Sequence, residues 1–86
     1  MSFISAISTF YLSERRDARL RDDPNATHEQ VHAAIDASRA AIDAVASIVP
    51  RSPEERDAAL GLLQDLTAAG EWQQQGARIR ANLSGR

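Results

Sequence analysis

Two histidines and a glutamate at the start of one predicted helix have the types and spacing that most directly indicate chemistry. His28 and His32 are four residues apart, and Glu29 follows the first of them. Residues four apart share one face of a helix, so both imidazoles can approach one metal ion. With zinc bound, a glutamate at this position activates the attacking water. Asp36, one turn beyond His32, completes a face of two histidines and one carboxylate.

This His-Glu-x-x-His spacing resembles the signature of the zincin metalloproteases over five residues. The resemblance implies zinc-dependent peptide hydrolysis, but the longer signature needs a glycine and a third histidine. Ile35 and Ser38 occupy those two positions, and the chain has no third histidine. The motif also lies at the amino end of its helix, where the helix dipole disfavours a cation. We therefore expect no metal and no other cofactor, and the metal-ligand candidates are His28, His32 and Asp36.

The composition removes most of the other common catalytic groups. The chain has no cysteine and, because all ten basic residues are arginine, no lysine. Thiolate nucleophiles, disulfides, Schiff-base lysines and the lysine of a phosphate-binding loop are therefore excluded. No serine, histidine and acid occur at a spacing that identifies a hydrolase. We predict that the protein is not an enzyme and has no catalytic residue.

The length and hydropathy of the chain predict one small domain in an aqueous compartment. At 86 residues the chain has room for a single core, and 43% hydrophobic with 26% charged residues is an ordinary globular composition. The apolar start, residues 3–12, is shorter than the roughly 20 residues that a membrane-spanning helix needs. It also lacks the features of a signal peptide, so we expect a cytoplasmic protein without a membrane span.

Charge is separated along the chain, although the net charge is only −2. Residues 1–21 sum to +2, residues 22–71 to −7 and residues 72–86 to +3. The overall acidity argues against a protein whose main task is to coat nucleic acid. Basic ends and an acidic middle fit either pairing within the chain or two different faces for partner molecules.

Capping and turn residues divide the chain into helical segments. Thr27 and Gln30 form a capping box, and Ser52 followed by Pro53 marks a second helix start. Gly70 is typical of a left-handed helix end. The predicted helices are residues 2–21, 28–49, 53–69 and 71–83. The last is either a separate helix or a bent continuation of the third. The sequence thus predicts an all-α fold, a small three- to four-helix bundle in which residues 1–86 form one domain.

Apolar spacing within these segments predicts which side chains are buried. The first helix has a stripe of Phe3, Ile4, Ile7, Phe10, Tyr11, Glu14 and Ala18. The second has a coiled-coil-like seam of Val31, Ile35, Ser38, Ile42, Val45 and Val49. The third has a stripe of Ala59, Leu60, Leu63, Leu66 and Thr67, with Leu62 beside it. Such a core is thin, so dimerisation or docking on a larger partner is a natural way to bury more apolar surface.

Two surfaces are candidate partner-binding sites. The first is the last helix, where an aromatic and apolar stripe lies beside arginines, a combination typical of protein interfaces. Its candidate residues are Trp72, Arg78, Ile79, Arg80 and Leu83. The second is an acidic stripe at seven-residue spacing on the second helix, which offers a surface for a basic partner. It consists of Glu29, Asp36 and Asp43.

The leading hypothesis, reached largely by exclusion, is a small non-enzymatic protein–protein interaction module. It would be a regulator, adaptor or antiactivator of bacterial type that binds another protein, with a second copy of itself as a further candidate partner. The alternative is a compact DNA-binding regulator whose last helix reads bases with Gln73, Gln74, Arg78 and Asn82. Nucleic acid is the less favoured partner because the chain is acidic overall. The third hypothesis is metal binding through the two histidines.

Overall fold

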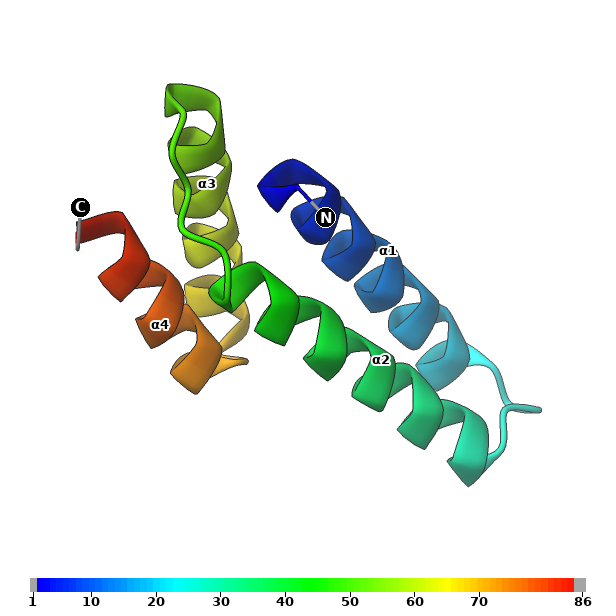
Figure 1. The fold of residues 1–86 in the computed structure, drawn as a ribbon. Coiled ribbons are helices and arrows are strands. Elements are labelled where there is room, and N and C mark those ends of the chain that lie inside the picture. The colour runs from blue at the N-terminus through cyan, green and yellow to red at the C-terminus, as the bar shows by residue number, and fades with distance from the viewer. Residues whose placement is uncertain (1, 85–86) are drawn as a thin grey trace.

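Two helical hairpins packed in two layers form the fold (Figure 1). The computed structural model describes residues 2–84. The first layer contains α1, Phe3–Asp22, and α2, His28–Ala46; the second contains α3, Pro53–Ala69, and α4, Gln73–Ser84. These residues contain four α-helices and no strand, which confirms the predicted all-α bundle. Within the same range, no helix combines the length and apolarity needed to cross a membrane.

The helix ends follow the capping residues of the sequence. Thr27 and Gln30 form a reciprocal capping box at the start of α2, as predicted, and Ser52 and Glu55 form a second one at the start of α3. Each box satisfies backbone amides that the first helical turn leaves without a partner. Gly70 ends α3 in the left-handed conformation with a φ of 69°. Local sequence therefore determines where α2 and α3 begin and where α3 ends.

α2 is shorter than the sequence predicts. It ends at Ala46 rather than at residue 49. Pro50 disfavours helical geometry at the residue before it, Val49, and has no amide hydrogen with which to continue the helix. The backbone carbonyl of Ala46 instead accepts a hydrogen bond from Nδ2 of Asn82 at 2.8 Å. The second layer thus supplies a partner for the carboxyl end of α2.

α4 is a separate helix and not a bent continuation of α3. It begins at Gln73, two residues later than predicted. The delay arises because Trp72 has a φ of 57°, close to the φ of 69° at Gly70. Two left-handed residues within three positions turn the chain back on itself, so α4 lies antiparallel beside α3 (Figure 1).

The hydrophobic core lies between the two layers. α1 packs along α2, while α3 lies against α1 and α4 lies against both α2 and α3. All four helices contribute to this core. Its largest fully buried apolar side chains are Phe3, Phe10, Ile42, Val45, Leu62 and Ile79. Because both layers share this one core, residues 2–84 form a single packed body.

The buried faces differ from the predicted stripes at several positions. Leu62 is fully buried, whereas Leu60 is 52% exposed and Thr67 is also exposed. α3 packs against α1 on one side and α4 on another, so its buried surface is wider than one stripe and displaced from it. Ile4 and Val49, which the periodicity also places in the core, are exposed. Val49 is exposed because it lies in the connection beyond the end of α2.

The turn end of the α1–α2 hairpin projects beyond the second layer (Figure 1), and the molecule measures 46 × 25 × 16 Å. We call this projecting part, residues 16–34, the arm. Asp17, within the arm, is only 3% exposed and pairs with Arg21, while Ser38 is fully buried nearer the core. Among the described residues, Oδ1 of Asp17 and Oγ of Ser38 have no hydrogen-bond partner. Buried polar atoms without partners are costly, so the α1–α2 contact is weakest toward the arm.

Two glycines of the second layer are expected to respond in opposite ways to alanine. Gly76 lies within α4, where an added Cβ would meet Leu63 at 3.8 Å and Leu66 at 3.9 Å, both ordinary contacts. Gly76→Ala is therefore expected to raise the free energy of unfolding by about 0.4–1 kcal/mol. Gly70→Ala is expected to lower it by about 1–2 kcal/mol because Gly70 is left-handed. Urea denaturation measures both effects, and a loss of stability in Gly76→Ala would contradict the packing described.

Candidate partner-binding groove

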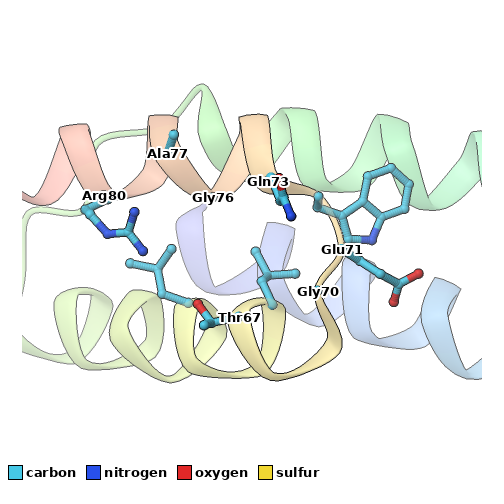
Figure 2. Close-up of a pocket in the computed structure, with 10 residues that line it drawn as sticks. Thr67, Gly70, Glu71, Gln73, Gly76, Ala77 and Arg80 are labelled. Carbon is cyan, nitrogen blue, oxygen red and sulfur yellow. The ribbon is translucent and has the colours of Figure 1, made fainter.

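An open groove lies between α3 and α4 on the side that faces away from the first layer (Figure 2). We call it the α3–α4 groove. Leu63 and Leu66 from α3 and the backbone of Gly76 from α4 border its centre. The other lining residues are Leu60, Gln64, Thr67, Ala68, Gly70, Glu71, Trp72, Gln73, Ala77 and Arg80. Because Gly76 has no side chain, the central part remains open and has a volume of about 190 Å³.

The charged residues of the groove are one arginine and one glutamate. Arg80 extends from α4 toward α3, and Glu71 lies in the connection between the two helices (Figure 2). Both side chains are exposed, and neither forms an ion pair with another residue of the 2–84 range. An arginine stays protonated at every physiological pH. The groove therefore combines an apolar floor with a guanidinium that is free to bind an anion.

The α3–α4 groove is not predicted from the sequence, because periodicity places Leu60 and Thr67 in the core. Both residues are exposed and line the groove. A signal was present in the sequence: Leu60, Gln64 and Thr67 follow one another at steps of four and three, as a stripe on one helical face does. This second stripe adjoins the buried one, so periodicity alone does not separate them.

Trp72 joins the second layer to the first. Its ring lies edge-on to Phe10 of α1 with centroids 6.4 Å apart, and the guanidinium of Arg39 on α2 lies 5.9 Å from its centroid. Its indole Nε1 donates a hydrogen bond of 3.4 Å to Glu14 of α1. The residue is half-buried and packs against the core. Trp72 therefore stabilises the fold, and its exposed part lines the end of the groove and a second hollow beside Ile35.

The other predicted binding residues of the last helix fall into two groups. Ile79 is fully buried and Leu83 is half-buried against the core, so both mainly stabilise the bundle. Arg78 and Arg80 are exposed, but only Arg80 lines the groove. Partner binding by these residues stays a prediction, and of the four only Arg80 contributes an exposed charge to the groove.

The predicted acidic stripe on α2 is not uniformly exposed. Glu29 and Asp36 are exposed, and Asp36 pairs with Arg39 at 3.7 Å. Asp43 is half-buried and accepts a hydrogen bond of 3.1 Å from Nε2 of Gln75 on α4. The stripe therefore leaves Glu29 as its one carboxylate without a polar contact to another residue within 2–84.

The histidine motif lies at the exposed start of α2. His28 and His32 are both exposed, as is Asp36. Across the described residues, no group of three histidine, cysteine or acidic side chains is placed to hold a metal ion. The spacing brings the two imidazoles to one helical face, but no other element supplies a further ligand.

Two polar residues of α4 bind the first layer rather than project outward. Asn82, one of the predicted base-reading residues, donates its hydrogen bond to the carbonyl of Ala46. Gln75 donates to Asp43. The exposed outer face of α4 keeps Gln74 and Arg78 as candidates for DNA contact. DNA binding through α4 stays a prediction with fewer available residues than the sequence indicates.

A hydrogen bond from Tyr11, whose pKa is raised, joins α1 to α3. The hydroxyl of Tyr11 donates to Oδ2 of Asp65 at 2.5 Å. Burial, together with this hydrogen bond and the negative charge of Asp65, raises the pKa of Tyr11 to about 12. Loss of the phenolic proton would place two negative charges side by side, so the contact holds the layers together only while Tyr11 is protonated.

No protein-family model, curated protein sequence or solved structure matches this chain.

Alkaline pH is expected to destabilise the protein through Tyr11. The folded state retains the phenolic proton up to a pKa of about 12, whereas the unfolded chain loses it near 10. The contribution of Tyr11 to stability is therefore fully present below about pH 10 and is lost as the pH rises from 10 to 12. The chain has one tyrosine, no cysteine and no lysine, so no other side chain has its ordinary pKa in this interval. Urea denaturation of wild type and Tyr11→Phe at these pH values measures the effect, and an equal fall in both proteins would contradict it.

Zinc is expected to leave the melting temperature unchanged, because His28 and His32 have no third ligand within reach among the described residues. The measurement is a thermal melt with and without equimolar zinc. A rise of several degrees that disappears in His32→Ala would show that the two histidines do form a metal site.

Proposed function

We propose that the protein is a small non-enzymatic interaction module, a cytoplasmic regulator or adaptor that binds another protein through the α3–α4 groove. The observation that carries the proposal is the apolar floor of this groove, which remains open on a folded domain. Leu63 and Leu66 form the floor, and Leu60 extends it across the exposed side of α3. Leu63 and Leu66 are only 8% and 6% exposed, so most of the exposed apolar surface of the groove belongs to Leu60. A hollow with an apolar base is typical of binding sites.

The charge of the groove supports a specific type of partner segment. Arg80 lies beside Leu63 and Thr67 and has no ion-pair partner within residues 2–84. An arginine next to apolar surface binds a carboxylate strongly and with defined geometry. A partner segment with an apolar side chain for the floor and an acidic residue for Arg80 matches both features. Amphipathic helices bind grooves in this way.

The ionisable residues of the groove support binding rather than catalysis. Only Glu71 and Arg80 among the lining residues are ionisable, and arginine does not act as a general base. A single carboxylate with one threonine hydroxyl, that of Thr67, and without a histidine or a second acid resembles no common hydrolytic arrangement. The α1–α2 hairpin remains free to contact a second molecule of the protein while the groove is occupied.

Partner capture is expected to depend on Leu60 and Arg80. Tagged wild-type protein recovers its partner from cell extract, and quantitative mass spectrometry measures the recovery. Leu60→Asp removes apolar contact and Arg80→Glu reverses the charge, so each is expected to reduce recovery at least tenfold. The matched controls are Val49→Asp and Arg78→Glu. Val49 is 41% exposed against 52% for Leu60, so the two aspartate variants change apolar positions of similar accessibility, and Val49 lies outside the groove.

Circular dichroism must show that all four variants keep the wild-type helix content. Undiminished recovery with both groove variants would contradict the proposal. Loss of binding in Arg78→Glu but not in Leu60→Asp would place the contact on the outer face of α4. The DNA-binding hypothesis is tested with the same proteins by fluorescence anisotropy on duplex DNA, where it requires salt-dependent binding that Arg78→Glu weakens.

A further inference from the structure

The first layer has a second face that no part of residues 2–84 covers. α3 and α4 lie on one side of the α1–α2 hairpin, where Tyr11 contacts Asp65 and Arg39 contacts Trp72. A helix turns by about 100° per residue. Thr9 is two residues from Tyr11, and Ala37 is two residues from Arg39. Thr9 and Ala37 therefore point about 200° away from the side that α3 and α4 cover. The exposed residues of this opposite face are Ser5, Thr9, Leu12, Ala33, Ala37 and Ala40.

The uncovered face has an uncharged centre. Residues 2–13 contain no charged side chain, and the exposed α2 residues at the centre of this face are alanines, with the uncharged Gln30 nearer the arm. Depletion of charge at the centre with charge at the rim is the typical composition of a protein interface. Short side chains on both helices also let another helix pair approach closely.

The charges at the rim are complementary between the two helices. Exposed Arg16 and Arg19 lie on α1, and exposed Glu29 and Asp36 lie on α2. In the antiparallel hairpin, the end of α1 at residue 22 lies level with the start of α2 at residue 28. The numbers of two residues that lie level with each other therefore sum to about 50. The two arginines are thus level with about residues 34 and 31, between the two acids.

We propose that a second copy of the chain covers this face in a symmetric dimer. The two-fold axis lies parallel to the hairpin, so that α1 of each copy packs antiparallel on α2 of the other. This arrangement places Arg16 and Arg19 of one copy against Glu29 and Asp36 of the other. An axis perpendicular to the helices would instead place these arginines opposite the uncharged start of the other α1. In this dimer the α1–α2 hairpins of the two copies face each other and together form a four-helix bundle. Both α3–α4 grooves stay open.

Sedimentation equilibrium over a concentration series tests the dimer. Wild type is expected to be dimeric at tens of micromolar. Ala37→Glu places a charge at the centre of the face and is expected to weaken dimerisation at least tenfold, with helix content unchanged. Ala81→Glu, at an exposed position of α4 outside the groove, is the matched control and is expected to remain dimeric. A wild type that is monomeric at several hundred micromolar, or a dimer that Ala37→Glu leaves intact, would overturn the proposal.

Disulfide trapping tests the position of the axis, because the chain has no native cysteine. Thr9 is level with about residue 41 of α2, so Thr9→Cys in one copy lies near Ala40→Cys in the other. A mixture of the two single variants is expected to give mainly the mixed disulfide dimer under mild oxidation. Predominant Thr9–Thr9 or Ala40–Ala40 dimers would overturn the parallel axis. A dimer that is lost in Leu60→Asp would assign self-association to the groove and overturn the proposed face.

Discussion

The docking of the two hairpins depends on one aromatic side chain that contacts both helices of the first layer. Trp72 packs edge-on to Phe10 of α1 and lies beneath the guanidinium of Arg39 on α2. To reach this position its backbone takes a φ of 57°, a left-handed conformation that costs a side-chain-bearing residue about 1–2 kcal/mol. The contacts of the ring offset that cost. The same backbone geometry starts α4 where it can lie beside α3, so the docking contact also determines the end of the groove.

Side chains of one layer also satisfy backbone carbonyls elsewhere in the bundle. Asn82 of α4 donates to the carbonyl of Ala46 at the end of α2, and Arg56 of α3 donates to the carbonyl of Leu83 near the end of α4 at 2.9 Å. The last carbonyls of a helix have no partner within that helix. Two polar residues that look like surface groups in the sequence therefore have structural roles. Neither of these two hydrogen bonds involves an arginine of α4. Arg78 and Arg80 form no ion pair within residues 2–84, so both are free to bind other molecules.

Local features of the sequence were sufficient to predict the elements but not the faces that they bury. The capping box at Thr27, the cap residue Ser52 and the left-handed Gly70 depend on neighbours within three residues, and each lies where predicted. Leu62 is buried instead of Leu60 because of how α3 lies between α1 and α4. The spacing of apolar residues along one helix does not contain this information. The groove was missed for the same reason, since it exists only when two helices are placed side by side. The buried Asp17 was missed because a carboxylate reads as a surface residue until the opposing helix is known.

The two buried polar atoms between α1 and α2 have a consequence for the order in which the molecule opens. Regions with few buried apolar contacts separate at a lower free energy than the core and expose their amides to solvent first. The arm has no second layer over it and contains Asp17, whereas residues near Phe10 and Ile42 lie beneath α3 and α4. Amide protons of the arm therefore exchange through local separation of the two helices from the turn inward. Those around Ile42 exchange only when the whole molecule unfolds, so α2 carries a gradient of protection along its length.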